Sequence, residues 1–340
     1  MIAKPYVSLL LGLSLALNGG CNRQASSPAT SSESTANTQA SGSTPSSGWH
    51  LFKKSTPPPP AQIWNEFSGD KAFAHVKALC DIGPRPIGSP ELQKARDYII
   101  ANLTKVGWEV EQQRFEDETP RGKRPFVNLI ARFAGVDGDH KPAPTNTQTI
   151  IVCSHYDTKI FDTIRFVGAS DGASSTGALI ELARVLALDP DMARKIELVF
   201  FDGEEAVSQF TETDGLYGSR YYAKNLRLTN RATQYKMGVL WDMIGDKDLT
   251  VTLSPDSPPE LAKGILSAST ALNLRQYFSY FDREIYDDHV PLNITGIPSI
   301  DLIDFDYIYW HTADDTLDKL SPGSLQKVGA VTLYFLRKSL

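Results

Sequence analysis

Residues 197–205, with the sequence ELVFFDGEE, constrain the fold of this chain most strongly. The segment begins with a short run of β-branched and aromatic residues, which predicts a buried strand. The acids Asp202, Glu204 and Glu205 follow directly. Burying them in apolar surroundings would be unfavourable, whereas the carboxyl ends of strands in an open α/β sheet line the crevice where ligands bind. An isolated Glu-Glu pair is more often a solvated turn, so the interpretation depends on the rest of the chain.

The composition is that of a soluble globular protein. The chain has 340 residues, of which 41% are hydrophobic and 22% charged, and its formal net charge is −6. This mild acidity and the lack of a basic stripe argue against nucleic acid as a partner. Length alone would permit two domains. We expect residues 61–340 to form a single α/β domain, which we take to be a monomer.

The amino terminus resembles an export signal. In residues 1–20, Lys4 supplies a positive charge, residues 7–17 form an apolar core, and small residues follow. Cys21 comes next, as at a bacterial lipoprotein processing site, although Leu17 lies one place too far from it. Plain secretion and a retained anchor would also fit this pattern. We therefore expect an exported protein that is either a membrane-tethered lipoprotein or periplasmic or extracellular.

Residues 21–60 are rich in Ser, Thr, Ala, Gln and Pro and end in four consecutive prolines. Such a segment cannot build a core, so it predicts a disordered tether with a stiff end. Two further cysteines, Cys80 and Cys153, are either a disulfide or two buried thiols. Their spacing is not that of a zinc site.

Strand and helix patterns alternate along the rest of the chain. This order predicts a mixed, mostly parallel central sheet with helices on both faces, and an early strand pair at 108–133 suits an antiparallel edge. The predicted helices cover 70–79, 89–107, 172–188, 217–226, 258–272 and 325–336, and the predicted strands cover 108–115, 126–133, 148–152, 197–201, 237–241 and 298–303.

Polar residues follow several of these strands. His155 and Asp157 follow one strand, Asp242 ends another, and His311 lies in the loop after a third, while Asp171 precedes a helix. Because parallel strands end at one edge of a sheet, we expect these side chains to converge with Glu204 and Glu205. Converging carboxylates repel one another unless a cation neutralises them. Histidine and carboxylate ligands without a thiolate suit zinc, and manganese or iron would accept a similar set.

Seven segments together resemble the zinc-dependent exopeptidase superfamily, and within it the glutaminyl cyclases. The resemblance covers about residues 65–340. Each segment is a weak signal alone, but seven in the same order are specific. They are HYD at 155–157, GASDG at 168–172, FFDGEEA at 200–206, LYGSRYYA at 216–223, WDMIG at 241–245, YDDHVP at 286–291 and WHTADDTLDKL at 310–320.

The resemblance implies roles for individual residues. It implies one zinc ion held by Asp171, Glu205 and His311, and a proton shuttle at Glu204. It also implies support of the site by the carboxylates of Asp242 and Asp287, and a pocket wall at Trp310. The implied reaction converts the N-terminal glutamine of a peptide to pyroglutamate and releases ammonia, with peptide or protein N-termini as substrates.

Two positions depart from the cyclase pattern. Phe210 lies where the cyclases carry a tryptophan after the Glu pair, and Tyr286 replaces a frequent glutamine. Both residues are therefore pocket candidates with altered chemistry.

The amino-acid sequence around Asp171 also resembles that of zinc aminopeptidases. In those enzymes His155 and Asp242 would bind a second zinc, and Glu204 would activate a water molecule to cut a peptide bond. For Asp157, support of the site without metal binding is favoured over direct ligation. A third class of function is a non-catalytic binding module on the same fold, which would be expected to lack some of the metal ligands or Glu204, and all of them are present here.

Overall fold

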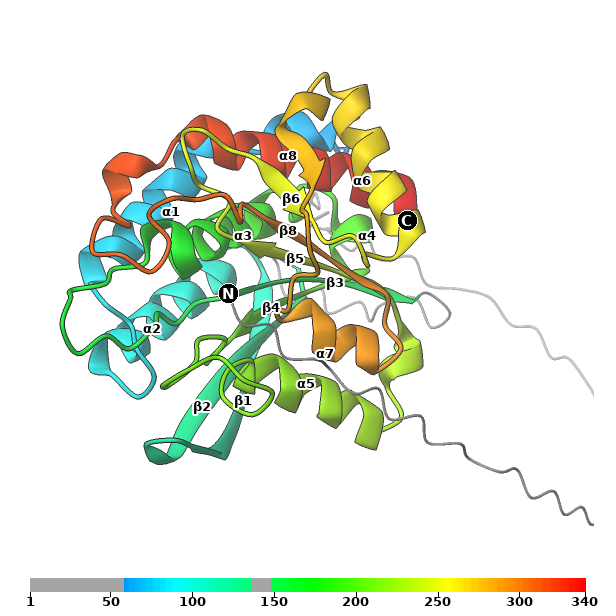
Figure 1. Ribbon diagram of the computed structural model, residues 1–340. Helices are drawn as coiled ribbons and strands as arrows, with labels where there is room; N and C mark the ends of the chain where they lie inside the picture. Colours follow the sequence, from blue (N-terminus) through cyan, green and yellow to red (C-terminus); the bar gives the residue numbers. More distant parts are fainter. Residues whose placement is uncertain (1–57, 136–147) are drawn as a thin grey trace, which may run out of the picture. The chain divides into compact units, whose positions relative to one another are not determined.

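The computed structural model describes residues 58–135 and 148–340 (Figure 1). The predicted signal, Cys21 and nearly all of the tether lie outside these ranges, so those assignments stay predictions. Within the described ranges, no helix has the length and apolarity needed to cross a membrane.

One eight-stranded sheet organises the domain, in the order β1-β2-β4-β3-β5-β8-β6-β7. The central strands β4, β3, β5 and β8 are parallel, whereas β1 and β2 form an antiparallel pair at one edge and β6 is antiparallel to β8. The predicted mixed sheet and its antiparallel edge are therefore confirmed. The strands are β1 (Trp108–Thr119), β2 (Gly122–Phe133), β3 (Thr149–His155), β4 (Ile196–Phe201), β5 (Tyr235–Asp242), β6 (Val251–Leu253), β7 (Phe278–Tyr280) and β8 (Ser299–Ile303).

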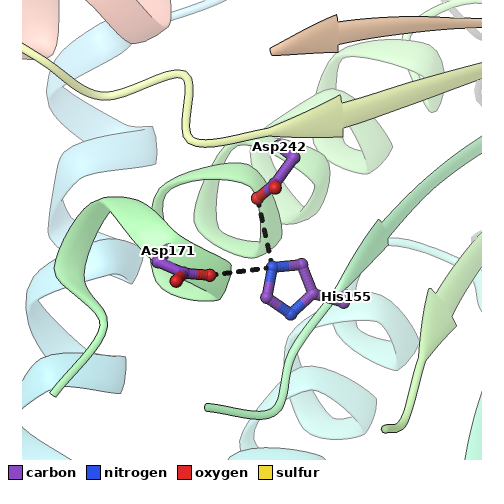
Figure 2. Close-up of side chains that lie close together, drawn as sticks. All are labelled: His155, Asp171 and Asp242. Atoms are coloured by element: carbon purple, nitrogen blue, oxygen red, sulfur yellow. Dashed lines mark hydrogen bonds and ion pairs between the residues drawn. The ribbon is translucent and has the colours of Figure 1, made fainter. Parts of the chain in front are cut away.

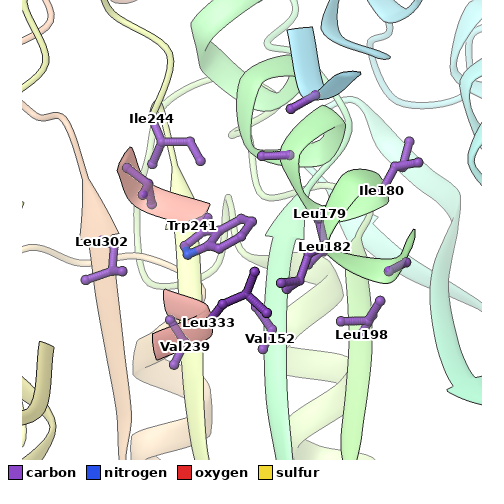
Figure 3. Packing of buried hydrophobic residues seen from close by; sticks show 14 of the residues in the cluster. Val152, Leu179, Ile180, Leu182, Leu198, Val239, Trp241, Ile244, Leu302 and Leu333 are labelled. Atoms are coloured by element: carbon purple, nitrogen blue, oxygen red, sulfur yellow. The ribbon is translucent and has the colours of Figure 1, made fainter. Parts of the chain in front are cut away.

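Helices cover both faces of the sheet (Figure 1). Successive strand residues point to opposite faces, so Val152 of β3 joins one apolar cluster and its neighbour Ile151 joins another. Figure 3 shows the first cluster, where Trp241 of β5 packs near Leu182 and Leu333. Its helices are α1 (Gly69–Ile82), α2 (Pro90–Lys105), α3 (Ser175–Leu186), α4 (Pro190–Ala193), α6 (Pro259–Ala271) and α8 (Pro322–Ser339), and those of the second cluster are α5 (Tyr217–Leu228) and α7 (His289–Ile294).

The structure corrects some sequence-based boundaries. The helix expected from residue 172 begins as α3 at Ser175, because Asp171 and Gly172 have non-helical backbone angles. The three-residue strands β6 and β7 and the short helix α7 were not predicted, since they are too short to show a periodic pattern. Cys80 and Cys153 are both free thiols, so they do not form a disulfide.

Candidate active site

Three side chains from distant parts of the chain meet at the carboxyl edge of the sheet. Asp171 lies in the segment before α3, Glu205 follows β4, and His311 lies in the loop after β8. His311 Nε2 is 3.3 Å from Asp171 Oδ2 and 3.2 Å from Glu205 Oε1. One possible ligand atom from each residue lies within 4.8 Å of the other two. This arrangement could hold one divalent cation.

A second group shares Asp171 with the first (Figure 2). His155 Nε2 is 3.1 Å from Asp242 Oδ1 and 3.3 Å from Asp171 Oδ1. The two oxygens of Asp171 therefore face different histidines, Oδ1 toward His155 and Oδ2 toward His311. The chain thus offers two adjacent sets of possible metal ligands.

Two glycines place Asp171. Gly168 and Gly172 have positive φ angles of 54° and 86°, in the region that favours glycine. A Cβ atom at Gly172 would lie 2.6 Å from the carbonyl oxygen of Asp157, so a larger residue would displace the backbone. The backbone at Asp171 itself is non-helical, at φ −79° and ψ 101°. The Gly-Ala-Ser-Asp-Gly sequence therefore forms a turn that presents the carboxylate ahead of α3.

Asp157 organises the two glutamates. Its Oδ1 accepts a hydrogen bond of 3.2 Å from the backbone N–H of Glu204, and its Oδ2 accepts one of 3.3 Å from that of Glu205. Asp157 Oδ1 also lies 3.5 Å from His155 Nδ1. One buried carboxylate thereby fixes the turn after β4 and contacts the ring at the end of β3.

A cavity of about 430 Å³ opens onto the first group. Asp171, Glu205 and His311 all line it, whereas His155 is only 1% exposed and does not. The ring of Trp310 stacks on that of His311 with centroids 4.3 Å apart. The remaining lining residues are Lys159, Glu204, Ser208, Gln209, Phe210, Asp242, Met243, Ile285, Tyr286, Asp287, Ile303, Phe305 and Trp310.

The comparison with known families agrees with this architecture. Residues 128–336, more than half of the chain, match Peptidase family M28. The chain belongs to this family.

Several proteins similar to this M28 protein are glutaminyl cyclases. It is 28% identical to the glutaminyl-peptide cyclotransferase of Dictyostelium discoideum over 80% of this chain and 85% of that one. The crystal structure of an Acidobacteriales bacterium glutaminyl cyclase is 34% identical with a TM-score of 0.72, covering 80% of this chain and 94% of that one. The crystal structure of a Zn-dependent exopeptidase from Parabacteroides distasonis is 27% identical to this chain with a TM-score of 0.71. The match covers 80% of this chain and 98% of that one.

The donor chemistry of this M28 site fits a metal. Asp171 Oδ2 is buried and, apart from its 3.3 Å ion pair with His311 Nε2, has no hydrogen-bond partner, so it has a lone pair free for an ion. His311 has a positive φ of 57°, a left-handed conformation that histidine, asparagine and aspartate adopt more often than other residues with a side chain. Nitrogen and oxygen donors without sulfur match the ligand preference of zinc. Asp171, Glu205 and His311 therefore form a donor set that fits a zinc ion.

Attraction between the histidines and the carboxylates shifts the pKa values of these possible ligands. Burial alone would lower the pKa of His311, but Asp171 and Glu205 raise it to about 9. Burial alone would raise the pKa of Asp171, yet His155 and His311 hold it well below its usual range. A metal must displace the proton that His311 otherwise carries, so binding should release protons.

Further carboxylates line the same cavity. Burial and the charges of Asp287 and Glu205 raise the pKa of Glu204 well above its ordinary value. Burial and the charges of Asp242 and Asp288 do the same to Asp287. Glu204 therefore sits where a carboxyl group can carry a proton near neutral pH, which general acid–base catalysis requires.

Asp202 does not belong to the cavity, contrary to the expectation that all three acids after β4 line the crevice. Its Oδ2 accepts a hydrogen bond of 2.7 Å from the backbone N–H of Val127 and pairs with Arg96 at 3.3 Å. Burial and the nearby charge of Asp157 raise the pKa of Asp202 to about 7. Its side chain joins β2 and α2 to the end of β4.

Sequence reasoning missed two supporting residues of the M28 site. Asp315 accepts hydrogen bonds from the backbone N–H groups of Ser170 at 2.8 Å and Asp171 at 3.1 Å, and from the Tyr307 hydroxyl at 2.8 Å. Arg85 is fully buried and donates to five backbone carbonyls, including those of residues 167 and 168. The bonds that tie both residues to the segment around Asp171 span 82 residues or more of the chain, so no local pattern signals them.

Replacing Asp315 by asparagine should weaken metal binding. The amide offers one acceptor oxygen where the carboxylate offers two, so the turn that presents Asp171 loses a hydrogen bond. Loss of a hydrogen bond that orients a metal ligand typically lowers metal affinity by about 10–100-fold. Competition with a chelator of known affinity would measure the change. The exposed neighbour Asp314, replaced in the same way, is the control, and equal affinities in the two variants would contradict this role.

Asp214 holds the loop that carries Phe210. Its carboxylate accepts hydrogen bonds from the backbone N–H groups of residues 207, 208 and 209 at 2.7, 2.9 and 3.0 Å, and from the Tyr217 hydroxyl at 2.8 Å. Burial alone would raise the pKa of Asp214, but these donors lower it overall.

Asp214→Ala should therefore destabilise the fold by about 1–3 kcal/mol in urea unfolding at neutral pH. Because the folded pKa is depressed, the stabilisation is present above the unfolded pKa of about 3.9 and is lost as pH falls through the folded value. The stability gap to wild type should shrink between about pH 5 and pH 3. Asp191→Ala, at a side chain 95% exposed, is the control. A pH-independent gap would refute the charge effect.

Proposed function

We propose that this M28 protein is a zinc-dependent glutaminyl-peptide cyclotransferase. The observation that carries the proposal is the cavity that Glu204 lines together with the group formed by Asp171, Glu205 and His311. Its similarity to glutaminyl cyclases over most of their length supports the same conclusion. The substrates are peptide or protein N-termini that begin with glutamine.

The residues present can perform the reaction. The α-amine of the substrate attacks its own side-chain amide carbon, so the N–C ring bond forms as the C–NH₂ bond breaks. Glu204 accepts a proton from the amine and donates one to the departing nitrogen, which leaves as ammonia. Asp287, which lines the same cavity, can hold the leaving amide by hydrogen bonding. When bound, zinc supplies Lewis-acid polarisation of a carbonyl oxygen.

The aromatic walls position the substrate for this step. Phe210 and Tyr286 pack edge to face with centroids 6.1 Å apart, and Trp310 lies against His311. Rings around a small cavity exclude water and restrict how a glutamine side chain can lie. Since the nucleophile and the electrophile belong to one molecule, the enzyme mainly supplies geometry and charge.

A metallo-aminopeptidase is the second candidate, and the group His155–Asp171–Asp242 favours it. Two zinc ions would then share Asp171, and Glu204 would activate a water molecule. The one-zinc account is preferred because His155 does not line the cavity. His155→Gln should accordingly leave one zinc per chain; a fall from two to one would support the aminopeptidase.

Mass spectrometry of a glutamine-initiated peptide incubated with the full chain tests the function. The cyclase predicts loss of one ammonia with every backbone bond intact. Release of free amino acids would overturn it in favour of the aminopeptidase. A peptide that stays unchanged, both with the zinc-loaded protein and with further zinc added to the assay, would support a non-catalytic binding module.

We also propose that the protein is exported, is held at the bacterial envelope by a lipid on Cys21 or by its signal, and acts as a monomer. The apolar run and following cysteine in residues 1–21 support the location. Labelling with a radioactive fatty acid would test lipidation, and the Cys21→Ser variant should not incorporate label.

A further inference from the structure

The imidazole of His311 has polar partners at only one of its two nitrogens. Its Nε2 lies 3.3 Å from Asp171 Oδ2 and 3.2 Å from Glu205 Oε1. The other nitrogen, Nδ1, makes no hydrogen bond to any residue that the structure describes. A histidine that binds a metal usually donates its second ring N–H to a carboxylate, a backbone carbonyl or water, and that bond fixes the ring. Among the described residues, contacts of another kind therefore orient His311.

Three aromatic rings surround this imidazole. Trp310 stacks on it, with centroids 4.3 Å apart and ring planes at 25°. Phe161 and Phe166 meet it edge to face, at centroid distances of 5.8 and 5.9 Å and interplanar angles of 76° and 86°. The two phenyl rings also meet each other edge to face, with centroids 5.3 Å apart. These are favourable arrangements for aromatic rings, and we call Phe161 and Phe166 the phenyl pair.

Anchors that do not involve His311 fix the phenyl pair. Phe166 is only 2% exposed, and the buried Arg85 donates hydrogen bonds of 3.0 and 3.2 Å to the carbonyls of the next two residues. Beside the other ring, Asp162 forms an ion pair of 2.9 Å with Arg121 in the turn between β1 and β2. The segment that carries both rings is therefore held to the rest of the domain at two points.

We propose that the phenyl pair positions the zinc ligand His311, holding Nε2 toward Asp171 and Glu205 in place of the usual hydrogen bond to Nδ1. This inference rests on the zinc site of the proposed function and not on the reaction. Neither phenyl ring lines the cavity, so the pair acts through His311. A carboxylate partner would raise the basicity of the imidazole, whereas phenyl rings fix its orientation without adding a charge beside the metal.

The zinc affinity of the full chain tests the phenyl pair. Phe161→Leu and Phe166→Leu keep an apolar side chain but remove the ring edge. We expect the dissociation constant for zinc, measured by competition with a chelator, to rise about fivefold in each variant, which is the size of one edge-to-face contact. Phe161→Tyr keeps the ring and should stay within about twofold of wild type.

Phe73→Leu is the matched control. Phe73 is half-buried on α1, packs against the main apolar cluster and does not contact His311. It makes the same chemical change and should bind zinc as wild type does. Urea unfolding of the zinc-free proteins checks that each variant is folded. If the buried variant Phe166→Leu does not fold, Phe161→Leu, at a half-buried side chain, decides alone.

Wild-type zinc affinity in Phe161→Leu would overturn the inference and leave the cyclase intact. A rise in KM for a glutamine-initiated peptide at unchanged zinc affinity would overturn it too, and would assign the phenyl pair to substrate binding. An equal loss of affinity in Phe73→Leu or in Phe161→Tyr would show a general effect of altered packing and would also contradict it. Failure of wild type to bind zinc would instead refute the zinc site of the proposed function.

Discussion

Replacing Glu204 by glutamine should lower kcat by about 10³-fold while zinc remains bound. The amide has nearly the shape of the carboxylate but cannot take the proton of the α-amine. Glu204 is not one of the three residues that approach one another as possible ligands, so the metal content should stay at the wild-type value. Steady-state cyclisation rates and elemental analysis of the same samples would measure both quantities.

Glu212 offers a matched control for this variant. It lies in the same loop as Phe210 but is exposed to solvent. Glu212→Gln makes the same chemical change and should keep full activity. Retention of substantial activity in Glu204→Gln would remove the proton-shuttle role, and loss of zinc in that variant would show that Glu204 acts through the metal.

Replacing His311 by alanine should remove both zinc and activity. His311 Nε2 lies within 3.3 Å of both Asp171 and Glu205, so its loss leaves two carboxylates without their nitrogen partner. A metal contributes several kcal/mol of transition-state stabilisation, which corresponds to a fall of about 10³-fold in kcat/KM. Isothermal titration with zinc and cyclisation kinetics would check the two effects.

The control for this variant is His75→Ala on α1, where the imidazole bonds to the Tyr98 hydroxyl at 2.7 Å and does not line the cavity. It should bind zinc with wild-type stoichiometry. Activity of His311→Ala near that of wild type, at stoichiometric zinc, would show that the remaining residues hold the metal without this ring.

Much of the fold follows from local sequence patterns. The β4 segment at 196–201 is a continuous buried run that acids follow, so its burial and its acidic end were both predictable. Ser89 and Pro90 predict the start of α2, and the Ser89 side chain does accept a hydrogen bond from the backbone N–H of Leu92. Strand β7 has only three residues, too few for a periodicity to emerge.

The supporting residues of the site were harder to predict, because their bonds are long-range. Asp315 contacts the backbone of Asp171, 144 residues away in the chain, and nothing in its own neighbourhood signals this. Asp202 follows the same strand as Glu204 and Glu205, yet its carboxylate accepts a hydrogen bond from the backbone of β2. Which of these three acids faces the cavity depends on the backbone turn at Gly203, whose φ is 73°.

Anomalous diffraction at the zinc absorption edge, from crystals of the full chain, tests the central claim most directly. We expect one peak per chain, in contact with Asp171, Glu205 and His311 at the wall of the cavity. No peak at this position in zinc-loaded crystals, or a peak held by His155 and Asp242 alone, would contradict it.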